Sequence, residues 1–165
     1  MKVLIGGAVM CVIAAAVLSA QMPTYGVTVT VAKGVDPAKF KTYSWIKGGP
    51  SPDKTVDAQI VAAVDKELPG VGLTKVASGK PDVLVTYYSL RRTDVNLEAK
   101  PDSAGKLPQY PVGTLMVALM DPGTRKRVVQ LRTDKPLELE PAKLEAGINA
   151  AVTEMFAKYP TRQKK

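Results

Sequence analysis

Residues 113–124 read GTLMVALMDPGT, and this stretch decides the fold. Large aliphatic side chains recur at every second position, which is the period of a strand with one buried face. They are Leu115, Val117 and Leu119, and the other face takes Thr114, Met116, Ala118 and Met120. In the turn Asp121-Pro122-Gly123-Thr124, Pro122 presets the first corner and Gly123 supplies a positive φ at the next. A second extended run at 127–133 completes an antiparallel hairpin.

Two further strands are predicted before this hairpin. Val27, Val29 and Val31 alternate with smaller or polar residues until Gly34 and Pro37 end the pattern. Residues 82–90, DVLVTYYSL, have the β-branched and aromatic enrichment of a strand with a buried end. Its adjacent tyrosines, at positions 87 and 88, should point to opposite faces of the sheet.

Two segments have the period of an amphipathic helix. Within residues 53–68, Ile60, Val64 and Leu68 recur every four positions, early carboxylates favour the helix start, and a Pro-Gly pair ends the pattern. The second helix begins after Pro141 and stops before Pro160. Its apolar stripe consists of Leu144, Ile148, Ala151, Val152, Met155 and Phe156.

Two stretches fit neither period. Phe40, Tyr43 and Trp45 cluster before the breaker run GGPSP at 48–52, and we expect them to fill one end of the core. Residues 93–112 hold three prolines, a glycine and several charges, which favours a long loop. Because so long a structureless loop is unusual in a compact domain, there are two alternatives. The loop is mobile and functional, or part of it extends the neighbouring strands into an arm.

The order of elements predicts a single α+β domain over residues 21–160. Two helices should pack on one face of a mainly antiparallel sheet of about four to five strands, in two layers. Residues 161–165 form a basic tail.

The first twenty residues have the features of a secretory signal peptide. Lys2 is the single charge before an apolar run from Val3 to Leu18, and Ser19 and Ala20 follow. The expected product is therefore periplasmic or secreted. Retention of residues 1–20 as an inner-membrane anchor is the alternative.

The charge balance and the missing residue types limit the function. The chain carries a formal charge of +8. On an exported protein this charge favours anionic lipid head groups, acidic polysaccharide or an acidic partner over nucleic acid, although it can also serve solubility alone. The chain has no His, and its one Cys, Cys11, lies in the segment that cleavage removes. Ser-His-Asp triads, Cys nucleophiles and His or Cys zinc sites are therefore excluded from the mature chain.

We expect no catalytic residue, metal or cofactor, and two weak catalytic patterns are outweighed by ordinary structural interpretations. Ser51 and Lys54 match the S-x-x-K spacing of penicillin-interacting enzymes but lack its companion motifs, so a loop before a helix start is favoured. Glu138 and Glu140, with Asp134 nearby, are the best carboxylates for a glycosidase or metal site, but acids before a helix are ordinary capping.

Six residues are candidates for ligand binding. Arg91 and Arg92 form one basic run at a strand end, and Arg125, Lys126 and Arg127 form another. If the sheet brings these ends to one side, they would make an anion-binding patch that Lys158 and the tail extend. Tyr88 would support stacking of a ligand if it stands on the open face of the sheet. Solvated charges and cross-strand packing are the alternative interpretations.

Several short motifs follow one another over nearly the whole mature chain, namely FKTYSW at 40–45, AVD at 63–65, PDVLVTY at 81–87, GTLMV at 113–117 with DP at 121–122, and AVTEMF at 151–156 followed by YP at 159–160. In their order and spacing, these motifs resemble the domain-of-unknown-function 4136 family of bacterial envelope proteins. It implies a bacterial exported protein, commonly a lipoprotein, with a mixed α/β domain and no assigned activity.

This sequence departs from the family pattern in two places. Members often carry a lipid-acceptor Cys at the end of the signal peptide, which is missing here and favours a soluble periplasmic product. Members also tend to have a Trp-Arg-Gly-like stretch in the second arm of the hairpin, where this chain has Val129-Gln130-Leu131.

Two functions of different class follow. The first is a non-catalytic envelope domain that binds an envelope component or a partner protein, with at most peripheral membrane contact unless residues 1–20 are retained. The alternative is a His-free, carboxylate-dependent hydrolase acting on an envelope polymer. The first is favoured because no cluster of catalytic groups is visible. The oligomeric state is open.

Overall fold

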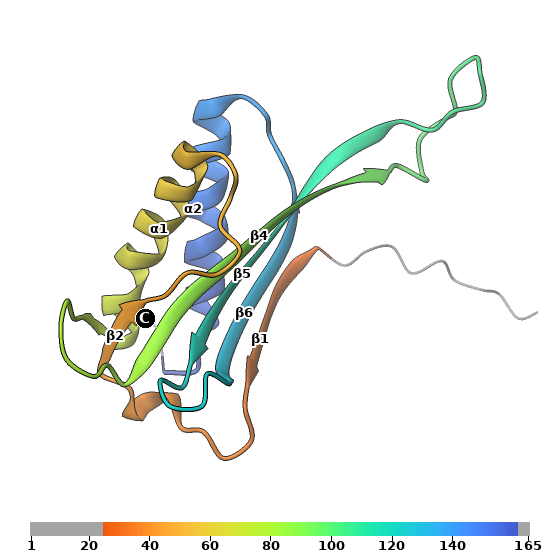
Figure 1. The fold of residues 1–165 in the computed structure, drawn as a ribbon. Coiled ribbons are helices and arrows are strands. Elements are labelled where there is room, and N and C mark those ends of the chain that lie inside the picture. Colours follow the sequence, from red (N-terminus) through yellow and green to blue (C-terminus); the bar gives the residue numbers. More distant parts are fainter. Residues whose placement is uncertain (1–24, 162–165) are drawn as a thin grey trace, which may run out of the picture.

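The computed structural model describes residues 25–161, which form a six-stranded sheet with two helices on one of its faces (Figure 1). The strand order is β1-β6-β5-β4-β2-β3. The strands are β1 (Gly26–Val31), β2 (Thr42–Trp45), β3 (Thr74–Lys75), β4 (Val83–Val95), β5 (Gln109–Met120) and β6 (Arg127–Pro136), and the helices are α1 (Lys54–Glu67) and α2 (Pro141–Ala157). The predicted signal peptide at 1–20 and the tail beyond Thr161 lie outside the described residues.

The hairpin of β5 and β6 confirms the prediction made from residues 113–133, with Val117 opposite Leu131. The prediction for its turn was wrong in one respect, because the positive φ, 57°, belongs to Arg125 and not to Gly123. The reason is that the turn closes one residue later. The Arg125 N–H donates to the Asp121 carbonyl at 2.9 Å, while the Asp121 carboxylate accepts from the N–H and hydroxyl of Thr124 at 2.6 and 2.8 Å.

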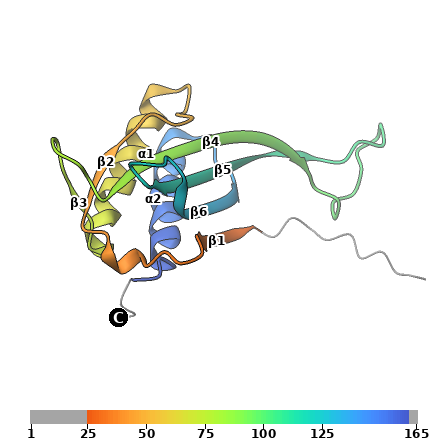
Figure 2. The same cartoon turned by 60° about the horizontal axis from the view of Figure 1, so that its bottom comes forward.

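Both helices occupy the segments predicted from their periodicity. The carboxylate of Asp53 caps α1 by accepting bonds from the N–H groups of Thr55 and Val56, at 2.8 and 3.2 Å. The two helices lie side by side over the sheet (Figure 2). Among residues 25–161, no helix is both long and apolar enough to cross a membrane.

The core lies between the helices and the sheet. Within the body of the sheet, the odd-numbered side chains at 83–87 of β4, 115–119 of β5 and 129–131 of β6 belong to this core, as the hairpin alternation predicted. The fully buried residues include Val64, Leu68, Val85, Val117, Leu119, Leu131, Val152 and Phe156. The core thus lies on one face of the sheet. Neither helix covers the other face, which we call the open face, although Leu84, Thr86 and Ala118 are buried within it.

The sheet is larger and more mixed than predicted, because β2 and β3 were not foreseen. β2 runs parallel to β4, with Tyr43 opposite Val83, and β3 runs parallel to β2. Tyr43 is fully buried, and Phe40 and Trp45 pack partly buried against the core. The aromatic cluster therefore fills the core as expected, while also forming an additional strand.

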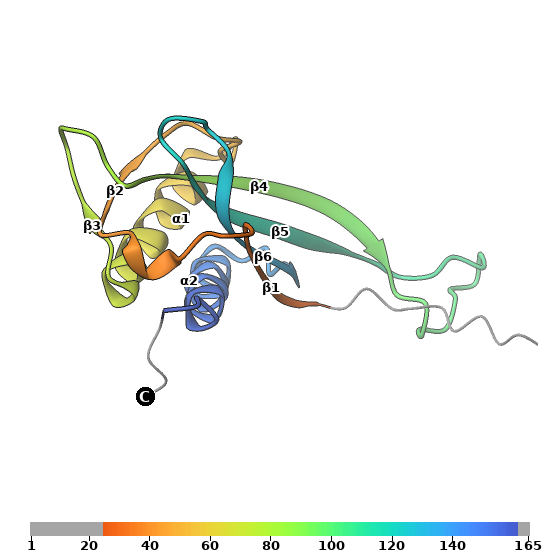
Figure 3. The ribbon, with the colours of Figure 1, turned by 90° about the horizontal axis from the view of Figure 1, so that it is seen from below.

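The arm alternative for residues 93–112 is confirmed. β4 continues to Val95 and β5 begins at Gln109, so that only residues 96–108 form a loop. Strands β4 and β5 extend past the helices and project from the body as a two-stranded arm (Figures 1 and 3).

A segment after β2 follows the edge of β4. The Ile46 and Gly49 N–H groups donate to the carbonyls of Val85 and Tyr87, at 2.9 and 3.1 Å. Between them, Gly48 lies so close to β4 that an added Cβ would sit 2.1 Å from the Thr86 side-chain oxygen. This segment borders the open face of the sheet.

Candidate functional site

The open face of the sheet carries exposed apolar side chains. Tyr88 is 40% exposed there, whereas Tyr87 is only 5% exposed and faces the core, which confirms that the two tyrosines point to opposite faces. Met116 lies directly opposite Tyr88 on β5. Gly49 lies against the Tyr88 ring: a Cβ built on Gly49 would lie 2.8 Å from the Cδ1 atom of that ring. The ring is therefore held between a strand and a backbone segment.

A β-bulge brings Arg127 to the same face. Leu119 pairs with Val129 but Met120 pairs with Arg127, which leaves Val128 as an extra residue. Without the bulge, alternation would place Arg127 on the core face with Val129. Instead the Arg127 guanidinium lies 3.7 Å from the Met116 sulfur and donates to the side-chain oxygen of Gln130.

These side chains line an open hollow of about 610 Å³. We call it the basic corner, and its lining residues are Tyr88, Met116, Met120, Arg125, Lys126 and Arg127. Among residues 25–161, none of its three cations forms an ion pair with a carboxylate. The nearby acid, Asp121, accepts hydrogen bonds from the backbone and side chain of Thr124, which lower its pKa. The basic corner thus combines three cations that form no ion pair within the described residues with an aromatic and two thioether side chains.

The second basic run lies elsewhere. Arg91 is opposite Gly113 of β5, whereas Arg127 is opposite Met120, so the two runs are separated by roughly 24 Å along the strand. The condition for one joint patch, that the sheet brings both strand ends to one side, is therefore not met. Lys158 is also apart, since its ammonium donates to the Val27 carbonyl at 3.3 Å.

Arg92 belongs to a closed polar network. Its guanidinium contacts Asp94 at 2.9 Å, Asp134 at 2.7 Å and the Thr114 hydroxyl at 3.0 Å. Arg132 bonds the same Asp134 carboxylate at 3.0 Å. With its charge shared between two carboxylates, Arg92 is engaged in holding strands β4, β5 and β6 together.

The carboxylates considered for catalysis do not converge. Asp134 is held by the arginines of this network, and Glu140 forms an exposed ion pair with Lys143 at 2.7 Å. In the described part of the chain there is no group of three or more His, Cys, Asp or Glu that could hold a metal ion. The side-chain oxygen of Ser51 accepts from the Asp53 N–H at 3.3 Å, in the turn that starts α1.

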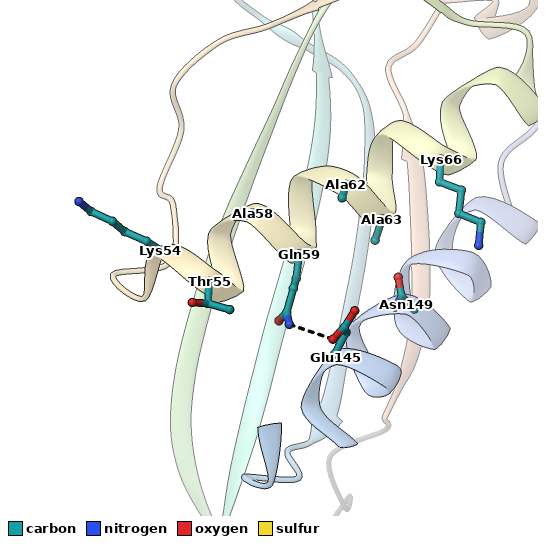
Figure 4. A pocket seen from close by; sticks show the side chains of 9 residues that line it. All are labelled: Lys54, Thr55, Ala58, Gln59, Ala62, Ala63, Lys66, Glu145 and Asn149. Atoms are coloured by element: carbon teal, nitrogen blue, oxygen red, sulfur yellow. Dashed lines mark hydrogen bonds between the residues drawn. The ribbon is translucent and has the colours of Figure 1, made fainter. Parts of the chain in front are cut away.

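A second hollow, of about 630 Å³, lies on the outer surface between α1 and α2 (Figure 4). Three alanines line its floor, and a hydrogen bond of 3.3 Å from Gln59 to Glu145 spans it. Lys54 and Lys66 stand at opposite ends of the α1 stretch drawn in Figure 4. Because its polar groups do not converge, this hollow is a weaker candidate than the basic corner.

Met116 and Met120 are members of the basic corner that were not predicted as candidates. A signal for them was present, because the alternation in residues 113–120 placed both on the face opposite the core. The bulge that directs Arg127 toward them has no comparable signature in the sequence. It arises from the pairing of β5 with β6.

The fold and the open face define a two-layer α+β domain with an uncovered sheet surface. The chain belongs to the family described as Domain of unknown function (DUF4136), whose model matches residues 27–161. No curated protein matches this sequence.

Three solved structures are similar to this chain in fold. A PDZ domain protein from Parabacteroides distasonis is 19% identical, with a TM-score of 0.59, and the match covers 85% of this chain but only 36% of that one. A PelC dodecamer from Paraburkholderia phytofirmans is 10% identical, with a TM-score of 0.54 and coverage of 86% and 100%. A DUF4136 family protein from Bacteroides thetaiotaomicron is 13% identical, with a TM-score of 0.51 and coverage of 86% and 98%.

Proposed function

We propose that this chain is an exported, non-catalytic binding domain of the bacterial envelope, and that the basic corner binds an anionic group of its ligand. The observation that carries the proposal is the placement of Arg125, Lys126 and Arg127 beside the exposed ring of Tyr88, without a carboxylate partner among residues 25–161. The signal peptide predicted at residues 1–20 and the bacterial family support the envelope location.

The chemistry of the basic corner selects phosphate or carboxylate oxygens joined to an apolar or ring-shaped body. Two guanidinium groups offer planar sets of donors that match such oxygens. Tyr88, Met116 and Met120 supply apolar surface at the same place. A lipid head group and an acidic polysaccharide both carry these features, so the two sources have to be separated by experiment.

The backbone at Arg125 supports a functional role for this residue. Its φ of 57° is a conformation that glycine adopts freely and that costs other residues on the order of 1 kcal/mol. An arginine at this position therefore lowers the stability of the turn. Such strain recurs at binding sites, where the side chain compensates for it.

The first test measures binding to vesicles containing phosphatidylglycerol and, separately, to polygalacturonate. The change is Arg125→Glu together with Lys126→Glu, and the matched control is Lys54→Glu together with Lys66→Glu, which alters the net charge equally on the opposite layer. We expect the corner variant to bind its preferred probe at least about tenfold more weakly, since each cation near an anionic surface contributes about 1 kcal/mol. The control should bind within about threefold of the parent.

Arg125→Gly separates binding from folding. It removes the guanidinium and relieves the left-handed conformation, so its stability should equal or exceed that of the parent while binding weakens. Equal losses in the corner and control variants would reduce the effect to net charge and contradict the proposal. Failure of the parent to bind either probe would contradict it as well.

A further inference from the structure

The outer edge of β4 is unpaired along the arm. Within the body, the carbonyls of Val85 and Tyr87 accept bonds on this edge, and the Ser89 N–H donates to the Gly49 carbonyl at 3.1 Å. Because backbone groups alternate along a strand, those of Arg91, Thr93 and Val95 point to the same side. In the part of the chain that the structure describes, they have no hydrogen-bond partner there. Figures 1 and 3 show no element beside this stretch.

The other edges of the sheet differ from this one. At the β1 edge, Lys158 donates to the Val27 carbonyl, and a lysine at an edge hinders pairing with another strand. The β3 edge is formed by a strand of two residues, which is too short to act as a template. The arm therefore presents the long open edge of the sheet.

We propose that two copies of this chain pair through this edge, as antiparallel strands related by a twofold axis at Thr93. The sequence around the axis is self-complementary. Arg92 lies opposite Asp94 of the second copy, and Asp94 lies opposite its Arg92, so this register opposes no like charges, while each copy keeps the Arg92–Asp94 ion pair of its own chain. On the other face, the two copies of Thr93 meet, and Arg91 lies opposite Val95 rather than another cation.

The direction of the free backbone groups suits the same register. In an antiparallel pair, opposed residues either exchange two hydrogen bonds or none. With the axis at Thr93, the opposed pairs that would exchange bonds are Thr93 with Thr93 and Arg91 with Val95. These are the residues whose backbone groups point outward on the arm.

Exposed apolar side chains flank the axis on both sides. Leu90, Val95 and Leu97 are 69%, 42% and 65% exposed, although they lie on an ordered arm. In the paired sheet, Leu90 would lie opposite Asn96 and Val95 opposite Arg91 of the second copy, so the neighbouring strand would cover part of these exposed side chains.

The interface is separate from the basic corner, which extends from Tyr88 in the middle of β4 toward the end of that strand where Leu84 lies opposite Met120. Dimerisation would leave both corners accessible, so the two proposals can fail independently.

The experiment combines sedimentation velocity with disulfide trapping. Cys11→Ser makes an introduced cysteine the only one in the chain. Thr93→Cys would place two cysteines across a hydrogen-bonded pair, with Cα atoms about 5.5 Å apart, which suits a disulfide. Gln109→Cys, on the other strand of the same arm, is the control. We expect a concentration-dependent dimer, and oxidation with diamide should cross-link the Thr93→Cys variant at least about tenfold faster than the control.

Thr93→Pro tests the backbone bonds without a cysteine. The Thr93 N–H faces away from β5, so its loss removes no hydrogen bond within the chain. We expect an unchanged far-ultraviolet circular dichroism spectrum and a dimer dissociation constant raised at least about tenfold, whereas Thr93→Ala should dimerise like the parent. A chain that stays monomeric up to about 1 mM overturns the proposal. So does a dimer in which position 93 cross-links no faster than position 109.

Discussion

Asp134 shows how much a single side chain contributes to the sheet. Burial opposes its charge, but hydrogen bonds from Arg132, Thr114 and Arg92 outweigh this effect and lower its pKa from 3.8 to about 2. The bonding groups come from three strands. The ionised carboxylate therefore stabilises the junction between the body and the arm.

The lowered pKa of Asp134 predicts a loss of stability in acid. Between about pH 4 and pH 2 the unfolded chain binds the proton first, so the free energy of unfolding rises with pH in that window and falls on acidification. The contribution is less than about 2 kcal/mol, because the side chain is partly exposed. Urea unfolding at several pH values should show it. Asp134→Asn should unfold more easily at pH 7 and depend less on pH from 4 to 2, and an unchanged pH dependence would contradict this account.

Predictions for single residues succeeded where alternation decides the outcome. The opposite orientations of Tyr87 and Tyr88 follow from strand geometry alone. The exposure of Arg127 on the open face depends on a bulge, and the positive φ at Arg125 depends on where the turn closes. Both are set by strand pairing, so no local sequence pattern reveals them. Four of the six residues of the basic corner were therefore foreseen, Tyr88 and the run Arg125, Lys126 and Arg127, but without its geometry.

At the scale of elements, the helices and the central hairpin could be predicted because they are long and strongly periodic. β2 has four residues and β3 has two exposed ones, which is too little pattern to identify a strand. The outer part of β4, RRTDV at 91–95, lacks apolar alternation because neither of its faces meets a helix. Its strand conformation is defined by pairing with β5 alone.

In the segment after β2, we expect that any side chain at position 48 would clash with β4. A Cβ there would lie 2.1 Å from the Thr86 side-chain oxygen and 2.4 Å from the Tyr87 carbonyl oxygen, and the latter belongs to the backbone of a central strand. We expect Gly48→Ala to lower the free energy of unfolding by at least about 1–3 kcal/mol. Urea unfolding can measure the change.

Gly147→Ala is the matched control for Gly48. Nothing lies within 4 Å of a Cβ at position 147, which is inside α2, so the substitution should be neutral or stabilising by up to about 1 kcal/mol. Equal effects of the two substitutions would show that the segment after β2 can move away from β4.

For the molecule as a whole, processing at the N-terminus is the first property to establish. If residues 1–20 are a cleaved signal peptide, intact mass spectrometry of the untagged product from its native host should give a chain starting near Gln21 in a soluble fraction. A membrane-bound product that retains Met1 would instead support an inner-membrane anchor. The basic corner would then be held near anionic lipid.

The pairing of β1 with β6 has a consequence for the order of events during synthesis. Gly26 pairs with Asp134, so the first strand of the domain can form its hydrogen bonds only after the last strand has been made. Closing so long a loop is entropically unfavourable until the intervening hairpin is in place, and contacts this distant in sequence form slowly. A nascent chain would therefore keep residues 26–31 unpaired until residues 129–134 have been made, and if residues 1–20 direct export, the chain would still be incompletely folded when it meets a secretion channel.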